Sequence, residues 1–253
     1  MQYSMKYIFG FAAAVCFVCS VLISAANVGL RERQEANQLL DKQRSVLQAA
    51  WLIQPGERAS RAQIEEMFQD IRERILDLRT GQLRDDIDPA EFDEARAPRP
   101  PAPENNAGIR FLPEQVKIYE VMKDGEVDMI VLPIFGQGLW GAMHGFLALD
   151  ADGNTIRGLT YYEHGETPGL GGEVDNPRWK RLWQGRLAYD ADGEVAIEVI
   201  KGTTGPPEEN PHEVDGLSGA TLTSRGVSNM LRFWVGEHGY APFLGARSED
   251  GRA

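Results

Sequence analysis

The chain has 253 residues, of which 42% are hydrophobic, so it is long enough to bury a core of its own. Its formal net charge of −12 argues against nucleic-acid binding, because phosphate backbones need basic partners. Both cysteines, Cys16 and Cys19, lie in the apolar N-terminal segment, so no disulfide is expected in the rest of the chain. At such a position a Cys-x-x-Cys pair is more typical of small apolar residues than of a redox or metal site.

The first predicted element is a membrane-spanning helix. No residue from Tyr7 to Leu30 is charged. A helix of this length is roughly 36 Å long, enough to cross a hydrocarbon core of about 30 Å. A cleaved signal peptide is the alternative, with Ser24-Ala25-Ala26 as its cleavage site, but the apolar stretch exceeds the usual length of about 7–15 residues. We therefore expect one retained anchor, whose orientation the basic residues near both of its ends leave open.

After the anchor, Leu39, Leu40, Val46 and Leu47 have helical spacing and are expected to continue the first helix. Ser60 is a predicted N-cap for a second helix, whose apolar face contains Ile64, Met67, Phe68, Ile71, Ile75 and Leu76. Residues 80–106 are acidic and proline-rich and predict an exposed insertion without packed structure. The expected division is a membrane anchor (1–30), a helical connector (31–80), an exposed acidic segment (81–107) and a folded domain (108–253).

From Val116 onward the pattern changes to strands. Three Asp-Gly pairs are flanked by apolar runs, which is a strong signal for β-hairpins. The predicted strand pairs are 116–123 with 127–132, 143–149 with 155–162, and 186–189 with 195–200. Together with the helices they predict an α+β fold built on antiparallel sheet. Two Asp-Ala-Asp-Gly turns superficially resemble calcium loops, but the twelfth position holds Tyr161 in one and Lys201 in the other, so they are interpreted as turns.

Two glycine-rich loops are candidates for ligand contact. Glu163–Gly172 follows a predicted strand, and its glycines allow close approach of backbone to a flat ring or an anion, while Pro168 stiffens the turn. It is not a Walker A loop, because no Gly-Lys-Ser/Thr follows. By itself such a loop is more often only a turn. Leu139 and Trp140 lie in the second loop, and the sequence leaves open whether Trp140 is part of the core.

The stretch Asp215–Thr223, reading Asp-Gly-Leu-Ser-Gly-Ala-Thr-Leu-Thr, is the most informative motif. Its threonines stand just before or at the start of a predicted helix over residues 224–237. A phosphate ester there would be stabilised by free backbone N–H groups and by the positive end of the helix dipole. The alternative is an ordinary hydroxyl-rich helix cap.

This motif resembles the flavin-attachment sequence of proteins that carry FMN as a phosphoester on threonine. The resemblance extends over nearly the whole chain, including 18–50, 158–172 and 233–244, to the NqrC family, the C subunits of the Na+-translocating NADH:quinone reductase. It implies that Thr221, rather than Thr223, accepts FMN from a separate flavin transferase. It also implies further flavin contacts from the motif and from the loop 163–172: Ser218, Gly219, Ala220, Leu222, Thr223, Glu166, Thr167, Gly169, Leu170 and Gly171. Leu139 and Trp140 are added as candidates from their own loop, because their apolar side chains would suit one face of the isoalloxazine ring.

The family implies an electron-transfer protein within a membrane complex of several subunits that couples quinone reduction to Na+ export. It also implies a single-pass protein of the bacterial inner membrane, with its folded domain on the periplasmic side. A flexible link to the anchor would let the flavin shuttle between donor and acceptor. No strand–Gly-x-Gly-x-x-Gly–helix unit is present, so direct NADH binding is not expected, and the four histidines lack metal-site spacing. The alternatives are the related G subunit of Rnf complexes and a membrane-anchored binding protein without redox function.

Overall fold

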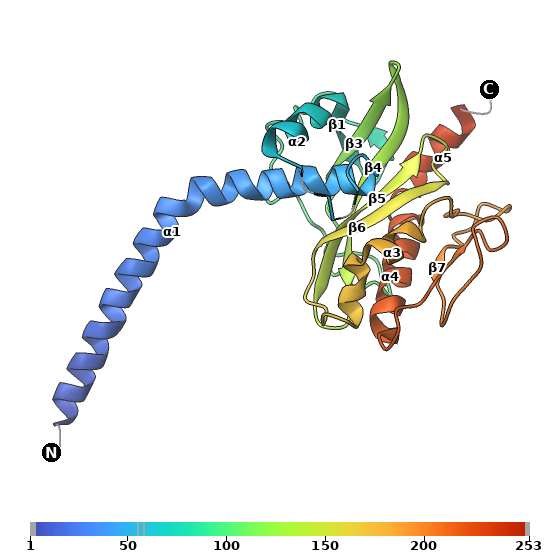
Figure 1. Cartoon of the computed structure of the whole chain (residues 1–253). Helices are drawn as coiled ribbons and strands as arrows, with labels where there is room; N and C mark the ends of the chain where they lie inside the picture. The colour runs from blue at the N-terminus through green and yellow to red at the C-terminus, as the bar shows by residue number, and fades with distance from the viewer. Residues whose placement is uncertain (1–3, 55, 58, 251–253) are drawn as a thin grey trace. The chain divides into compact units, whose positions relative to one another are not determined.

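The computed structural model of the protein describes residues 4–54, 56–57 and 59–250 (Figure 1). The chain separates into two compact units, Met1–Lys42 and Gln43–Ala253. The first unit consists of most of helix α1 (Met5–Ala49), which continues without a break into the second unit. Within α1, Met5–Arg31 is long and apolar enough to cross a membrane, and none of its most apolar window is buried in the protein. This helix matches the predicted anchor and suggests membrane attachment.

The second unit begins with the last turns of α1. Val46, Leu47 and Ala49 are fully buried in this unit, whereas the apolar residues of Met5–Arg31 are exposed. α2 (Arg61–Met67) follows, and Ser60 caps it as predicted. The Ser60 hydroxyl accepts a hydrogen bond from the Gln63 backbone, and the Gln63 side chain accepts one from the Ser60 backbone, which forms a capping box.

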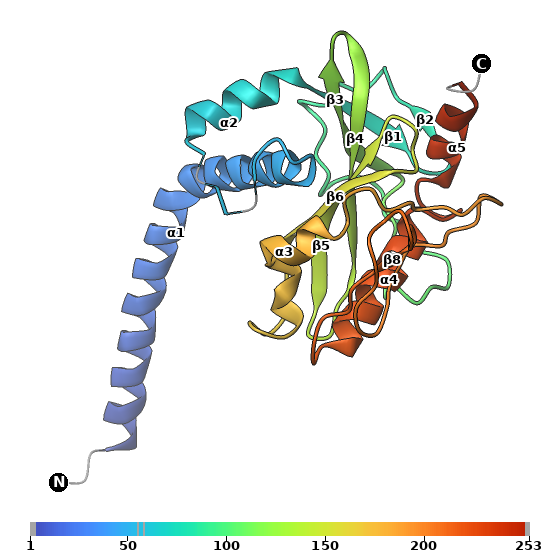
Figure 2. The same ribbon diagram turned by 45° about the vertical axis from the view of Figure 1, so that its right-hand side comes forward.

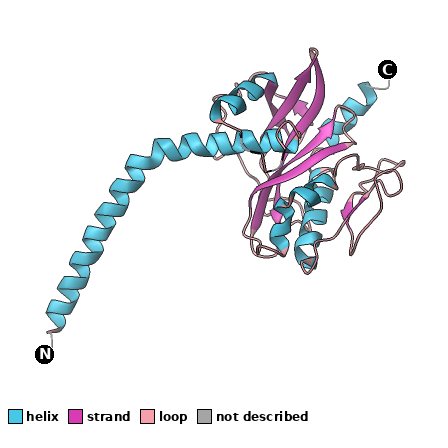
Figure 3. Cartoon of the chain, in the orientation of Figure 1, coloured by secondary structure: helices cyan, strands magenta, loops and turns pink. Residues whose placement is uncertain are grey.

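A six-stranded antiparallel sheet, in the order β2-β1-β3-β4-β5-β6, forms the centre of the described part of the second unit (Figure 3). Its strands are β1 (Ile71–Asp77), β2 (Gln82–Leu83), β3 (Gln115–Lys123), β4 (Glu126–Gln137), β5 (Ala142–Asp150) and β6 (Ile156–Glu163). Two predicted hairpins are confirmed: β3 pairs with β4 and β5 with β6. Asp124 and Gly125 have φ values of 54° and 88°, the left-handed geometry of a tight hairpin turn.

The predicted second helix is wrong beyond Met67. After a short 3₁₀ turn, η1 (Phe68–Asp70), residues 71–77 form β1 and pair with β3 along their whole length. Ile71 and Ile75 are β-branched and suit a strand, and residues 71–77 pair with β3 along the edge that β3 would otherwise leave open to solvent. The folded unit therefore includes strands from the segments predicted as helical connector and exposed insertion. The four-part division of the chain stays a prediction.

The prediction for residues 80–106 is wrong in one respect, because part of this segment is packed. The backbone of Ala102 donates to Arg110 (2.9 Å), and Pro98 and Pro100 accept bonds from Glu114 and Leu112 (both 3.0 Å). Prolines lack an N–H, so they enter this pairing through their carbonyl groups alone. Ala107, the last residue of the segment predicted to be exposed, is buried in the core, as is Ile109 just after it.

The third predicted hairpin is reduced to a single bridge between Tyr189 and Val195. β7 (Glu198–Val199) pairs instead in parallel with β8 (Glu213–Val214). Arg186, at the start of the predicted hairpin, is buried and donates from its guanidinium to the carbonyls of Leu182, Asn210 and Gly205. These bonds hold three loop carbonyls around Arg186, where the sequence predicts a regular strand.

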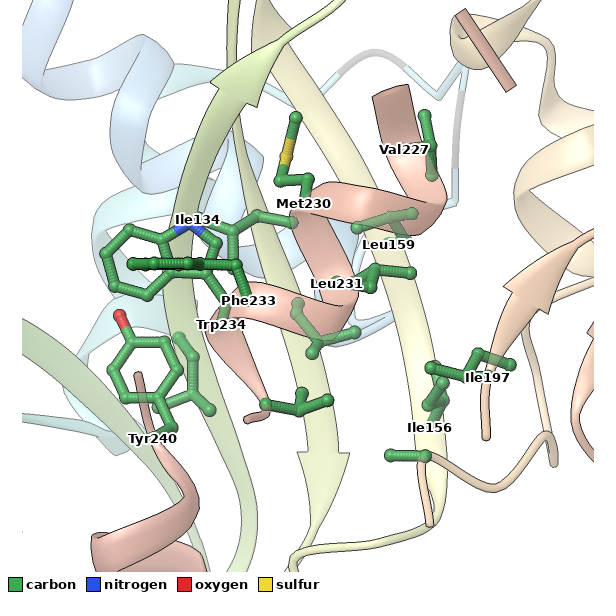
Figure 4. Packing of buried hydrophobic residues seen from close by; sticks show 14 of the residues in the cluster. Ile134, Ile156, Leu159, Ile197, Val227, Met230, Leu231, Phe233, Trp234 and Tyr240 are labelled. Carbon is green, nitrogen blue, oxygen red and sulfur yellow. The ribbon is translucent and has the colours of Figure 1, made fainter. Parts of the chain in front are cut away.

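The remaining elements are a short 3₁₀ turn, η2 (Gly171–Asp175), and helices α3 (Pro177–Arg181), α4 (Thr221–Trp234) and α5 (Ala241–Asp250). Figure 2 shows α4 along one face of the sheet, and Figure 4 shows its buried side chains. Val227, Met230, Leu231 and Trp234 are all inaccessible to solvent and pack in one core with residues of β4 and β6. This packing fixes the position of the N-terminus of α4.

Gly158→Ala tests the docking of the end of α1 on the sheet. A methyl group at Gly158 would overlap the carbonyl oxygen of Ala49 and lie 2.5 Å from Nε1 of Trp51. We expect a loss of about 2 kcal/mol in unfolding free energy, typical of overpacking. The measurement is thermal unfolding of the full chain in detergent, followed by circular dichroism. Gly245→Ala, which meets no atom within 4 Å, is the control; equal midpoints for the two variants would contradict this packing.

Candidate functional site

Thr221 is the first residue of α4, and it is exposed. The N-cap residue is Ala220, whose side chain makes no capping hydrogen bond. The N–H groups of the first helical turn therefore lack a side-chain acceptor from the N-cap, and they form the positive end of the helix dipole. Gly219, just before the cap, has φ = +72°, a conformation that favours glycine. The hydroxyl of Thr221 thus stands at an accessible, uncapped helix start, which suits an anionic substituent.

Thr223 has the opposite environment. It is fully buried, and its hydroxyl donates to Oε2 of Glu166 at 2.5 Å. Residues two apart on a helix are about 200° apart around its axis, so Thr221 and Thr223 lie on opposite sides of α4. The two threonines of the motif are therefore distinguished by burial: one hydroxyl is open to solvent and the other is engaged in the interior.

Glu166 is itself buried, with 5% of its surface exposed. Its Oε1 accepts hydrogen bonds from the backbone N–H groups of Leu139 (2.8 Å) and Trp140 (3.0 Å). One carboxylate therefore joins three segments that are far apart in sequence: the 138–141 turn, the loop after β6, and the first turn of α4. A buried carboxylate needs such donors to replace the water that it has lost.

The loop after β6 makes a tight turn beside this contact. The carbonyl of Thr167 accepts hydrogen bonds from the N–H groups of Leu170 (3.1 Å) and Gly172 (2.9 Å). Gly169 has φ = +77°, as expected for glycine in the third position of a turn with proline before it. Leu170 then reaches toward the motif, since a Cβ atom on Gly219 would lie 3.0 Å from its Cδ2.

Four apolar side chains remain exposed around the start of α4. The exposed fractions are 42% for Leu139, 68% for Trp140, 44% for Leu170 and 54% for Leu222. Trp140 therefore lies at the surface and is not a core residue, which answers the question that the sequence left open. Side chains of this kind offer apolar contact to a flat aromatic ring.

A groove of about 660 Å³ adjoins Thr221 on the side of α4 that carries Arg225 and Arg232. Its other wall is formed by β7 and the loop after it, and Ser218 and Gly219 of the motif also line it. Arg232 is paired with Glu198 at 2.6 Å. Neither this wall nor Arg225 is among the residues predicted from the motif. A signal was present, because Thr221, Arg225, Asn229 and Arg232 follow a spacing of three or four residues along one helix face.

Two buried serines attach α4 to the surrounding loops. The Ser224 hydroxyl accepts a hydrogen bond from the N–H of Leu217 (3.1 Å), within the motif. The Ser228 hydroxyl accepts one from the N–H of Val199 (2.9 Å), on the far wall of the groove. Asp215, which opens the motif, does not cap α4: its carboxylate accepts from the N–H of Thr204 (2.8 Å). These contacts hold the motif and the groove wall against the helix.

Charged side chains support the loop after β6 from the other side. Asp175 contacts Nε2 of His164 at 2.8 Å and Nζ of Lys180 at 3.4 Å. Burial lowers the pKa of Lys180, and the neighbouring Asp175 opposes that shift. The other ring nitrogen of His164 accepts from the N–H of Glu166 (3.2 Å), so this network fixes the backbone that carries the buried carboxylate.

Comparison with known proteins defines the class first. Residues 138–236 match the family described as the FMN-binding domain, a range that begins at the 138–141 turn and ends just after α4. It therefore encloses all three segments that meet at Glu166.

The relatives extend further than this domain. The chain is 47% identical to the C subunit of the Na(+)-translocating NADH-quinone reductase of Yersinia pestis, over 91% of its length and 88% of the relative's. It is 45% identical to the C subunit of the same name in Pseudomonas aeruginosa, over 92% of each chain. The crystal structure of Shewanella oneidensis NqrC matches with a TM-score of 0.73 at 33% identity, covering 82% of this chain and 96% of that one. The chain belongs to the NqrC family, the C subunits of the Na+-translocating NADH:quinone reductase.

Ser224→Ala and Ser228→Ala test the attachment of the motif and groove wall to α4. Each substitution leaves a backbone N–H without its hydroxyl acceptor, and the N–H of Leu217 belongs to a residue that is only 6% exposed. We expect each to lower the unfolding free energy by about 1–3 kcal/mol. Thermal unfolding of the full chain measures this effect, with the exposed Ser218→Ala as control. Midpoints within the error of that control would show that the two bonds contribute nothing.

Proposed function

We propose that this protein is an electron-transfer subunit of a membrane NADH:quinone oxidoreductase that couples quinone reduction to Na+ export. The support is its membership of the NqrC family over nearly its whole length, together with an FMN-binding domain that encloses the site described above. Bound FMN would supply the redox chemistry, accepting and passing on electrons, while the protein positions it. The protein acts only as part of the complex, with the other subunits as its partners.

We further propose that FMN is attached covalently by a phosphoester to Thr221. The observation that carries this proposal is the contrast between the two threonines: Thr221 is exposed at an uncapped helix start, whereas Thr223 is buried and bonded to Glu166. In the attachment step the donor is FMN activated as a phosphoanhydride: the bond from Thr221 Oγ to the FMN phosphorus forms, the anhydride P–O bond breaks, the other phosphate leaves, and the hydroxyl proton passes to solvent. A separate flavin transferase is the proposed catalyst.

The residues present fit such a group. The uncapped first turn offers N–H donors to the phosphate. Because the chain has a net charge of −12, such donors must be supplied locally. For the isoalloxazine ring we propose contacts with the exposed side chains of Leu139, Trp140, Leu170 and Leu222. Ser218, Gly219 and Ala220 would approach the phosphate and sugar chain, and the Thr167–Gly171 turn would approach the ring through its backbone. Glu166 and Thr223 are buried, so they would support the residues that contact FMN rather than touch FMN themselves.

The alternatives are less well supported. Relatives that cover about nine-tenths of the chain are NqrC proteins, which favours this family over the Rnf G subunit. A binding protein in which Thr221 is only a helix cap has no support in the geometry, because Ala220 occupies the N-cap position. We also propose that the protein lies in the bacterial inner membrane, anchored by Met5–Arg31, with the folded domain in the periplasm.

Flavin fluorescence of the denatured protein band tests the covalent bond. Material made together with the flavin transferase is expected to fluoresce under ultraviolet light after denaturing electrophoresis. Thr221→Ala should abolish the signal, and Thr223→Ser should keep it because serine preserves the bond to Glu166. Thr221→Ala should also leave the fold intact, since the exposed Thr221 is not the N-cap. A fluorescent Thr221→Ala band would refute the assignment.

The side of the membrane is tested by cysteine labelling in whole cells. Asp192 lies in an exposed turn, so Asp192→Cys in a Cys16→Ser, Cys19→Ser background gives one accessible thiol on the folded domain. A membrane-impermeant maleimide that passes the outer membrane should label it in intact cells, because the thiol would face the periplasm. Labelling only after the inner membrane is opened would place the domain in the cytoplasm. The cysteine-free parent is the control.

A further inference from the structure

We propose that Glu166 and Thr223 are a positioning pair, which holds the flavin-bearing turn of α4 in register with the apolar residues Leu139 and Trp140. The proposal rests on the flavin attachment proposed for Thr221. Its basis is a chain of hydrogen bonds: Thr223 Oγ1 donates to Glu166 Oε2 at 2.5 Å, and Oε1 of the same carboxylate accepts from Leu139 and Trp140. A single buried side chain thus determines the spacing between the helix start and the opposite loop.

The contact is closed to solvent and to larger residues. Glu166 is 5% exposed and Thr223 is fully buried. A Cβ atom on Gly138 would lie 2.5 Å from Oε1, and one on Gly171 would lie 2.6 Å from the hydroxyl oxygen of Thr223. All three bonds are donated to the carboxyl group, one by the Thr223 hydroxyl and two by backbone N–H groups.

The exposed side chains of the turn need this support. Trp140 is 68% exposed and Leu139 is 42% exposed, so burial does little to fix where their side chains stand. Their backbone N–H groups, both bonded to one carboxylate oxygen, determine their place instead. At the other end, Thr223 lies two residues after Thr221 on the opposite side of the helix, so its bond fixes the turn from which Thr221 projects outward.

Four variants separate this role from a general effect on folding. Glu166→Ala removes the acceptor, whereas Glu166→Gln keeps an oxygen for the two N–H groups and presents an amide to Thr223. Thr223→Val removes the hydroxyl at nearly constant shape, and Thr223→Ser restores it. Glu163→Ala, an exposed glutamate at the end of β6, is the matched control.

The first measurement is amide hydrogen exchange in full chains that also carry Thr221→Ala, so no flavin is attached. Glu166→Ala should speed exchange at Leu139 and Trp140 by about tenfold or more, because both N–H groups lose their acceptor. Thr223→Val should do the same at Ser224, whose N–H bonds to Ala220 in the first turn. Glu166→Gln and Thr223→Ser should stay within about threefold of the parent.

The second measurement is the fluorescence anisotropy of the flavin in chains that retain Thr221. Glu166→Ala and Thr223→Val should lower it toward the value of a freely turning group, and the two conservative variants should not. Exchange and anisotropy no different from those of Glu163→Ala would overturn the positioning role. If Glu166→Ala fails to fold, the Thr223→Val and Thr223→Ser pair decides. The exchange result does not depend on flavin, so failure of attachment at Thr221 and failure of the positioning pair are distinguishable.

Discussion

The close approach of α4 to the end of β4 is the constraint on which the site depends. Gly226 of the helix faces the strand, where a Cβ atom would lie 2.5 Å from the carbonyl oxygen of Gln137. At the other end of the helix, Trp234 Nε1 donates to the carbonyl of Phe135 at 2.7 Å. A helix held at both ends against one strand has little freedom to slide or rotate. Its first residue therefore stands at a fixed place beside the turn that follows β4.

The exposure of the site bears on the covalent attachment proposed for Thr221. The apolar side chains available to a flavin ring are between 42% and 68% exposed, so they cover a ring only in part. Apolar contact contributes in proportion to the area that it removes from water, and an open site removes little. An electron carrier must nevertheless stay open enough for its partners to approach. A phosphoester at Thr221 would retain the cofactor without deeper burial, and binding affinity would not have to compensate for exposure.

The sequence predicted what local chemistry decides. The Asp-Gly turn at Asp124 and the capping box at Ser60 depend on residues within three positions of one another, and both are confirmed. The segment 71–77 was wrongly predicted as helix because its apolar spacing fits that period, whereas pairing with β3, about 45 residues later in the chain, makes it a strand. The resemblance placed the attachment motif and the loop 163–172 in one site, and the apolar side chains of Leu139 and Trp140 suggested the other loop. The structure brings these three segments together at Glu166.

The bond between Glu166 and Thr223 could not be predicted from local sequence patterns, because it too depends on a distant partner. It joins residues 57 positions apart, and nothing in either loop alone marks the carboxylate as buried. Arg186 is a similar case, since its three carbonyl acceptors come from separate loops. Buried polar residues of this kind need partners for every hydrogen-bonding group, and such partners are visible only when the chain has folded. Motif reasoning therefore named Glu166 and Thr223 as site residues but did not predict the bond that joins them.

The connection between anchor and domain bears on how such a carrier reaches its partners. The flexible link considered from the sequence is not found between Met5 and Ala49, where the described chain is one continuous helix. Its last turns are buried in the folded unit through Val46, Leu47 and Ala49, so they move with that unit. Within Met5–Ala49 the described chain therefore offers no loop to serve as that link, and the buried last turns of α1 belong to the folded unit.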